Sequence, residues 1–108
     1  MLIFGIIRTV KEIVAISLSE SSALDHAESV WLFGSLAHNM NPSDVDILLV
    51  YDPTDDTSAV KALCFREIME NRTLTVLGLQ SDVILLTKDE EEQVLFARDA
   101  NAIRIWSS

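Results

Sequence analysis

The sequence has 108 residues, of which 49% are apolar, enough to form the packed core of one domain. Seventeen Asp and Glu residues outnumber eight Lys and Arg residues, so the formal net charge is −9. A protein that binds nucleic acid mainly through its phosphates needs a basic surface, and this balance therefore argues against a nucleic-acid partner. The acidity fits a cation site, a basic partner or simple solubility.

The sequence predicts neither a signal peptide nor a membrane-spanning segment. Residues 1–7 are apolar, but Arg8 and Lys11 follow them, whereas a signal peptide has its positive charges first. No apolar stretch is long enough to span a bilayer. Cys64 is the only cysteine, which excludes an intramolecular disulfide and a thiolate metal cluster, and we interpret it as a core residue. We expect one domain over residues 1–108, soluble, cytoplasmic and without a membrane partner.

The first half of the chain predicts a helix followed by two strands. Apolar residues at helical spacing predict an amphipathic helix over residues 6–26, although serines weaken its second half. Ser29–Phe33 predicts a buried strand that Gly34-Ser35 ends, and Leu36–Met40 predicts a turn or a short helix. Asp44–Tyr51 predicts a second strand, which is apolar on both faces in its later part and therefore central in the sheet.

A second long helix is predicted after the turn that follows Tyr51. Thr57 or Ser58 can begin this helix as its cap. Residues 71–79 are ambiguous, because strand-forming residues there are interrupted by Gly78. The buried stripe of the helix is predicted to consist of four residues: Val60, Leu63, Cys64 and Ile68.

The end of the chain predicts a strand, a helix and an edge strand. Asp82–Leu86 reads as the third strand, and Thr87 and Glu90 have the spacing of a capping box. The helix that they open is predicted to run to about Ala100, and Ala102–Trp106 is predicted to add a short edge strand. This helix is predicted to bury Val94, Leu95 and Ala97. The order of elements predicts an α/β or α+β fold, a small mixed β-sheet covered by helices.

Two carboxylates stand at the start of the second strand. Asp44 and Asp46 are two residues apart, so their side chains project from the same face of the strand. Parallel carboxylates at the edge of a core repel each other, and a divalent cation would compensate them. Oxygen ligands of this kind suit magnesium. An Asp-x-Asp alone would also fit a capped turn, but here it lies between a strand that ends in Gly34-Ser35 and an apolar strand.

Gly34 and Ser35 predict a phosphate-binding turn. A glycine at the end of a buried strand lets the backbone approach a ligand closely. Free N–H groups at the start of a helical turn favour an anion, and the Ser35 hydroxyl can donate one more hydrogen bond. Asp82 repeats the pattern of Asp46 at the start of the third strand. If the two strands are neighbours, three carboxylates can hold two metal ions, or Asp82 can take a proton from an attacking hydroxyl.

The segment FGSLAHNMNPSDVDILLVY resembles the signature of the nucleotidyltransferase superfamily that includes DNA polymerase beta. More narrowly, it resembles the small stand-alone minimal nucleotidyltransferases, which carry Gly-Ser, a spacer, Asp-x-Asp and a later Asp on a following strand. The resemblance implies the nucleotidyltransferase fold. The matching residues are Gly34 and Ser35, then Asp44 and Asp46, then Asp82.

Two positions depart from the pattern of the minimal family. The spacer Leu36–Ser43 is shorter than is usual, which would alter the triphosphate pocket. His38 stands where the family often has a basic residue, and it can replace that cation only when protonated or by hydrogen bonding. With this reservation, Gly34, Ser35 and His38 form the nucleotide-binding set that we expect.

The resemblance implies transfer of a nucleoside monophosphate from a nucleoside triphosphate, with ATP as the expected donor, to a hydroxyl. Asp44, Asp46 and Asp82 would be the catalytic residues and the ligands of two Mg²⁺ ions. Family members of this size commonly pair with an all-helical HEPN partner, as antitoxin to toxin, and can modify it with AMP. Small size and acidity favour such a protein acceptor over RNA or a small molecule such as an aminoglycoside.

Two other functions remain open. The chain would fit a catalytically degenerate binding subunit, or an antitoxin that acts by complex formation, because the spacer is short and His38 replaces a cation. The high apolar fraction for so small a domain also fits a homo-oligomer or complex interface. A magnesium-dependent phosphohydrolase is a third reading, which the Gly-Ser element disfavours.

Overall fold

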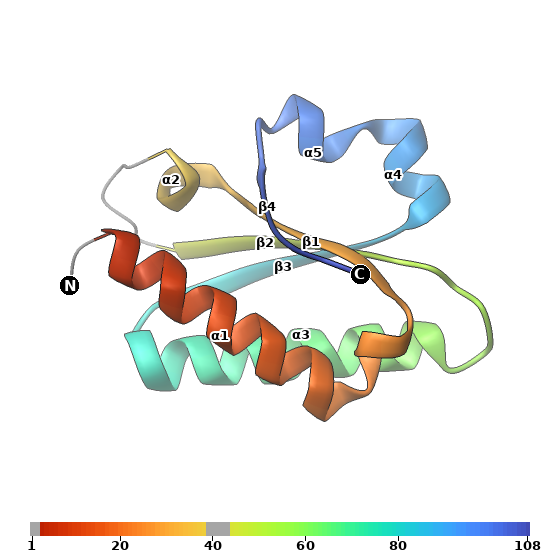
Figure 1. Cartoon of the computed structure of the whole chain (residues 1–108), viewed down its shortest axis with the longest axis horizontal. Helices are drawn as coiled ribbons and strands as arrows, with labels where there is room; N and C mark the ends of the chain where they lie inside the picture. The colour runs from red at the N-terminus through yellow and green to blue at the C-terminus, as the bar shows by residue number, and fades with distance from the viewer. Residues whose placement is uncertain (1–2, 39–43) are drawn as a thin grey trace.

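The computed structural model describes residues 3–38 and 44–108, with the side chains of residues 3, 4 and 35 left out. The chain forms a four-stranded sheet with helices on both sides (Figure 1). The strands are β1 (Ala27–Phe33), β2 (Asp44–Tyr51), β3 (Gln80–Thr87) and β4 (Ile103–Ser107). The helices are α1 (Ile3–Ser21), the short 3₁₀ helix η1 (Ala23–Asp25), α2 (Gly34–Ala37), α3 (Ser58–Leu77), α4 (Lys88–Val94) and α5 (Phe96–Asp99).

The sheet is mixed, as the sequence predicted. Its strand order is β3-β2-β1-β4; β2 and β3 are parallel, whereas β1 is antiparallel to both β2 and β4. The predicted central position of β2 and edge position of β4 are both confirmed. The helix α3 forms the crossover between the parallel strands β2 and β3.

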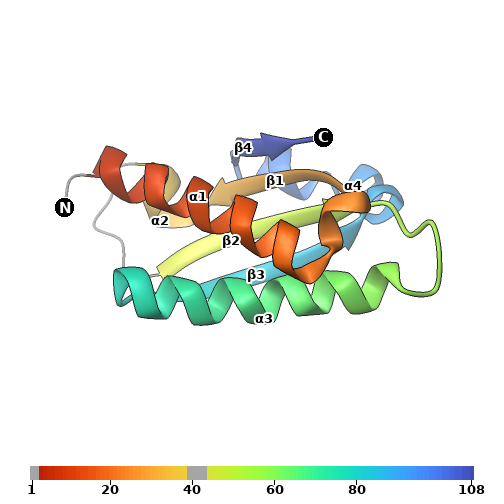
Figure 2. The same cartoon turned by 60° about the horizontal axis from the view of Figure 1, so that its bottom comes forward.

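The two faces of the sheet differ in how they are covered. Helices α1 and α3 lie side by side on one face, and α4 and α5 lie on the other (Figures 1 and 2). Val45, Ile47 and Leu49 of β2 belong to the main core with α1 and α3, whereas Leu48 and Val50 form a smaller core with α5. Helices α4 and α5 lie over the later part of their face, and α2 contacts β2 on the side where β2 starts (Figure 1).

The first helix ends earlier than the predicted boundary at residue 26. It stops at Ser21, and Ser22 has a left-handed backbone with φ 61°. The Ser21 hydroxyl accepts a hydrogen bond from the Ala23 N–H at 3.1 Å. Serine side chains that bond to the nearby backbone compete with helix, which explains the early end.

The predicted buried stripe of α3 was wrong. Val60 and Leu63 are 64% and 47% exposed, and Cys64, expected in the core, is only half-buried. The buried residues are instead Ser58, Ala62, Phe65, Met69 and Thr73. Two of these are polar, so a pattern of apolar residues did not indicate them. Their burial is possible because their hydroxyls donate to backbone carbonyls, Ser58 to Asp55 and Thr73 to Met69, each at 2.7 Å.

The structure shows how α3 begins and where it ends, two features that the sequence left open. Thr57 precedes the helix, but its side chain forms no cap; instead its N–H donates to Asp55 Oδ1 at 2.8 Å. The ambiguous residues 71–77 are helical, and Gly78 ends the helix with φ 68°. A glycine in this conformation is a common helix stop.

The last predicted helix is divided in two. The capping box is confirmed, since Thr87 Oγ1 accepts from the Glu90 N–H and Glu90 Oε1 accepts from the Thr87 N–H. Leu95 then breaks the helix with φ 50°, so Val94 and Leu95 are exposed rather than buried, while Ala97 is buried as predicted. None of the helices in the described residues is long and apolar enough to cross a membrane.

Candidate functional site

Asp44 and Asp46 lie at the start of β2, a central strand of the sheet. They are the first and third residues of β2, so both side chains point to the face that α4 and α5 partly cover. Burial rises along this face, from Asp44, which is exposed, through Asp46, which is half-buried, to the fully buried Leu48. The two carboxylates therefore stand where the packed face opens to solvent.

Asp82 lies beside Asp46 on the neighbouring strand. The parallel register of β2 and β3 pairs Asp46 with Asp82, and Asp44 with Gln80. Paired residues of adjacent strands point to the same face, so Asp44, Asp46 and Asp82 share one face. The condition set by the sequence, that the second and third strands are neighbours, is thus met, and Asp82 is exposed.

Gly34 packs against Asp46 from the side of β1. The antiparallel register of β1 and β2 pairs Phe33 with Asp46, which brings the start of α2 to the carboxylate. Gly34 has φ +75°, and a Cβ built on it would overlap Oδ2 of Asp46 and lie 3.1 Å from its Cγ. Any other residue here would be strained by the positive φ and would have to displace the Asp46 carboxylate, whereas glycine lets the backbone of α2 approach it closely.

The negative charge of this site has no cationic partner in the described part of the chain. Burial raises the pKa of Asp46, and the charges of Asp82 and Asp44 raise it further. No Lys, Arg or His of the described residues forms an ion pair with any of the three. Clustered carboxylates with no counter-ion are a donor set that fits a bound cation.

The arrangement fits an open magnesium site better than a closed protein cage. In the described residues, no group of three or more Asp, Glu, His or Cys side chains is close enough to hold a metal ion by itself. Magnesium is usually held by one or two carboxylates, with water and substrate phosphates as the remaining ligands. Asp44 and Asp46 supply such a pair of carboxylates at the partly exposed start of β2.

The remaining predicted site residues are only partly visible. Ser35 lies in the first turn of α2, beside Gly34, but its side chain is outside the described residues. His38 follows α2 and is exposed. The rest of the shortened spacer, residues 39–43, also lies outside the described residues.

The comparison with protein families decides the class of this chain. Residues 10–107 match the model of the nucleotidyltransferase domain. The chain belongs to the nucleotidyltransferase domain family. This match confirms the resemblance that the spacing of Gly34, Ser35, Asp44 and Asp46 predicted. A search of curated proteins finds no match.

Three solved structures share the nucleotidyltransferase fold of this chain. A candidate nucleotidyltransferase from Sulfolobus solfataricus is 21% identical, with a TM-score of 0.64, over 97% of this chain and 83% of that one. A MntA–HpeT toxin–antitoxin variant with two Asp-to-Glu substitutions is 16% identical, with a TM-score of 0.56. A toxin–antitoxin structure with AMP-PNP is 18% identical, also with a TM-score of 0.56. Each of the latter two alignments covers 91% of this chain and 73% of the other.

Two contacts of β1, the strand that leads to Gly34, were not predicted from the sequence. Phe33, opposite Asp46, is held by Phe96 of α5, whose ring meets it edge-on at 5.0 Å between centroids. Arg104 of β4 pairs with Trp31, and its guanidinium carbon lies 5.8 Å from the centre of a Trp31 ring. The position of Phe33 directly before Gly34 was a usable signal, whereas the Arg104 contact depends on strand register, which the sequence does not reveal.

Proposed function

We propose that the protein transfers a nucleoside monophosphate from a nucleoside triphosphate to a hydroxyl group. One observation carries the proposal: Asp44 and Asp46 share a face of β2, with Asp82 paired to Asp46 and the Gly34 backbone against its carboxylate. The membership of residues 10–107 in the nucleotidyltransferase domain family supports it.

The proposal assigns a role to each residue of the site, with two alternatives for Asp82. Asp44 and Asp46 hold Mg²⁺, which when bound neutralises phosphate charge and orients the triphosphate for in-line displacement. Gly34 and Ser35 donate hydrogen bonds to the distal phosphates, and His38 adds a donor at the same end. Asp82 completes a second metal site or takes the proton of the acceptor hydroxyl.

The proposed reaction exchanges a phosphoanhydride bond for a phosphoester bond. The acceptor oxygen bonds to the α-phosphorus as the bond from that phosphorus to the bridging oxygen of the β-phosphate breaks. Pyrophosphate leaves with the electron pair of the broken bond, and the acceptor proton passes to a carboxylate or to water. The residues of the chain position the two oxygens and stabilise the charge between them.

ATP and a protein acceptor are the substrates that we propose. One fold neighbour is a toxin–antitoxin structure with AMP-PNP, an ATP analogue. Another is a toxin–antitoxin variant whose two substituted aspartates are two positions apart, the spacing of Asp44 and Asp46. Together with the acidity of this chain, these neighbours support a basic partner protein, with a HEPN-type helical protein as the first to test.

The proposal is tested by following label from ATP. The wild type and the Asp44→Asn/Asp46→Asn variant are incubated with Mg²⁺, candidate partner proteins and ATP labelled at the α-phosphate or the γ-phosphate. We expect the α-label on the acceptor and the γ-label in pyrophosphate, with both products lost in the variant. Release of the γ-label as free phosphate, without transfer of the α-label, would instead indicate a phosphohydrolase.

A non-catalytic binding subunit is the second candidate. The short spacer and the replacement of a basic residue by His38 favour it, as do the exposed apolar side chains on α3. This candidate predicts a stable complex with the partner that the Asp44→Asn/Asp46→Asn variant forms equally well, without label transfer by either protein.

A further inference from the structure

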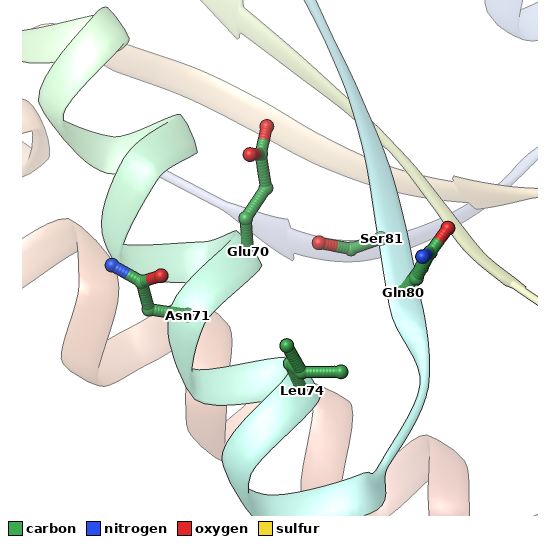
Figure 3. A pocket seen from close by; sticks show the side chains of 5 residues that line it. All are labelled: Glu70, Asn71, Leu74, Gln80 and Ser81. Atoms are coloured by element: carbon green, nitrogen blue, oxygen red, sulfur yellow. The ribbon is translucent and has the colours of Figure 1, made fainter.

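A surface pocket lies between α3 and the start of β3, away from the covered core. Its volume is about 320 Å³, and it is lined by Glu70, Asn71 and Leu74 of α3, which lies beside the first residues of β3 (Figure 3). Gln80 and Ser81 complete the lining. The Ser81 hydroxyl oxygen is buried and has no hydrogen-bond partner in the described structure. A buried hydroxyl without a partner calls for an explanation, and a polar group bound in the pocket would supply one.

The lining of the pocket suits a long basic side chain. Glu70 supplies a carboxylate, and its contact with Arg66 is long, 3.9 Å between side chains that are both about half exposed. Leu74 is 56% exposed and offers apolar surface for a methylene stem. The hydroxyl of Ser81 and the amide of Asn71 add acceptors for the N–H groups of a guanidinium or ammonium.

The strand β3, which lines one side of the pocket, has no strand on its outer edge within the described residues. β3 is the outer strand of the sheet, and it pairs with β2 without a register shift from Gln80 to Thr87. Among the described residues, no backbone hydrogen bond joins residues 80–86 to any element other than β2. An edge this long and regular is a template for another strand, and no proline or bulge protects it.

Alternation along β3 links the pocket to the candidate catalytic site. Ser81 faces α3 and the pocket, whereas Asp82, the next residue, faces the side of Asp46. A residue of an added strand points to the same face as the residue that it pairs with. A segment paired along β3 would therefore place one side chain in the pocket and its neighbour beside Asp82.

We propose that β3 binds an extended, basic segment of the acceptor polypeptide as an additional strand. A Lys or Arg of the segment fills the pocket beside Glu70, and the adjacent residue presents its hydroxyl beside Asp82. The net charge of −9 favours a basic segment electrostatically. This inference rests on the proposed function, since it names the class of acceptor for that site. Addition of a strand to a sheet edge is an established mode of peptide recognition.

Binding of synthetic peptides tests the inference without requiring catalysis. The probe is a fluorescent peptide of alternating Thr and Val with a central Arg-Tyr pair, compared with a Glu-Tyr peptide and with a backbone N-methylated Arg-Tyr peptide. We expect only the unmodified Arg-Tyr peptide to bind, and hydrogen exchange of the β3 amides to slow when it does. Equal binding of the N-methylated peptide, or unchanged exchange of β3, would overturn the inference.

Variants on α3 locate the basic side chain. Glu70→Gln is expected to weaken binding of the Arg-Tyr peptide roughly threefold to fivefold, the effect of a partly exposed ion pair. Glu67→Gln, an exposed residue of the same helix outside the pocket, is the matched control and should change nothing. Glu70→Gln also removes the contact between Arg66 and Glu70 within α3. Arg66→Gln removes that contact but keeps the Glu70 carboxylate, so it should not weaken peptide binding. Equal effects of Glu70→Gln and Glu67→Gln would also overturn the inference.

The inference and the proposed function can fail separately. If the peptide binds at β3 but no α-label is transferred to any acceptor, the docking edge stands and the transferase proposal fails. If α-label is transferred to a partner protein with the same KM for the wild type and Glu70→Gln, the transferase proposal stands and the docking edge is wrong.

Discussion

The α-carbon of Gly34 lies against the carboxylate of Asp46, with no room for a side chain between them. This contact joins the end of β1 to the start of β2 at the candidate site. It gives one glycine two reasons to be there: a positive φ of 75° and the close approach of an acidic side chain. The chain offers a control for the first reason, because Gly78 has φ +68° but open space around it.

Gly34→Ala should therefore lower the free energy of unfolding more than Gly78→Ala does. Gly78→Ala is expected to lower the free energy of unfolding by about 1–2 kcal/mol, the cost of a left-handed backbone for alanine. Gly34→Ala has this cost and in addition displaces the Asp46 carboxylate, so we expect a larger loss and weaker Mg²⁺–ATP binding. Urea denaturation and calorimetric titration measure both effects. Unchanged nucleotide binding by Gly34→Ala would show that the contact does not serve the site.

The raised pKa of Asp46 predicts a pH-dependent stability difference in metal-free protein. Because the folded pKa lies above the ordinary value of 3.8, ionisation of Asp46 opposes folding. The penalty is absent well below pH 3.8, grows as the pH rises through the folded pKa, and is complete above it. Asp46→Asn should thus have a higher Tm than the wild type at neutral pH, with no gain in strong acid.

Magnesium should reverse this order of stability. Added Mg²⁺ is expected to raise the Tm of the wild type, since binding to the folded state stabilises it, and to leave Asp46→Asn nearly unchanged. Thermal unfolding at several pH values, with and without Mg²⁺, measures both parts. If Asp46→Asn is less stable than the wild type at every pH without metal, the proposed repulsion among the three carboxylates is contradicted.

The buried face of α3 predicts a contrast between two close positions. Phe65 is fully buried, so Phe65→Ala should destabilise the protein by about 3–5 kcal/mol. Leu63 is 47% exposed, and Leu63→Ala should change stability by no more than about 0.5 kcal/mol. Urea denaturation midpoints of the two variants give the comparison. Similar losses for both would mean that Leu63 is covered in solution, for instance by a second copy.

The capping box of α4 predicts a smaller effect. Thr87→Ala removes the hydroxyl that accepts the Glu90 N–H and should cost about 1 kcal/mol. Hydrogen bonds from the Thr87 N–H and hydroxyl lower the pKa of Glu90, so the box stabilises the protein above the ordinary Glu pKa. This contribution should fade as the pH falls through the lowered pKa. A Thr87→Ala penalty that is constant from neutral to strongly acidic pH would contradict it.

Local features of the fold were predictable from the sequence. The bounds of β2 and the capping box at Thr87 were correct because each depends on residues close together in the chain. The sharing of one face by Asp44 and Asp46 follows from strand geometry alone. The roles of these carboxylates remain a prediction.

Features that depend on distant packing were harder to predict. The predicted buried face of α3 was wrong because it was inferred from apolar residues alone. Ser58 and Thr73 are also buried, since their hydroxyls donate hydrogen bonds to backbone carbonyls of the preceding turn and of the helix. The pairing of Asp46 with Asp82 requires the parallel crossover through α3 and its register. The contact of Gly34 with Asp46 depends on the antiparallel register of β1, which the spacer length does not specify.

The most direct test of the central claim is binding of a non-hydrolysable ATP analogue to the purified protein, because it requires no acceptor. Titration is done with and without Mg²⁺, on the wild type and on Asp44→Asn/Asp46→Asn. We predict binding that requires Mg²⁺ and is lost in the variant. Absence of Mg²⁺-dependent binding to the wild type, or equal binding to the variant, would contradict a nucleotidyltransferase site at Asp44 and Asp46.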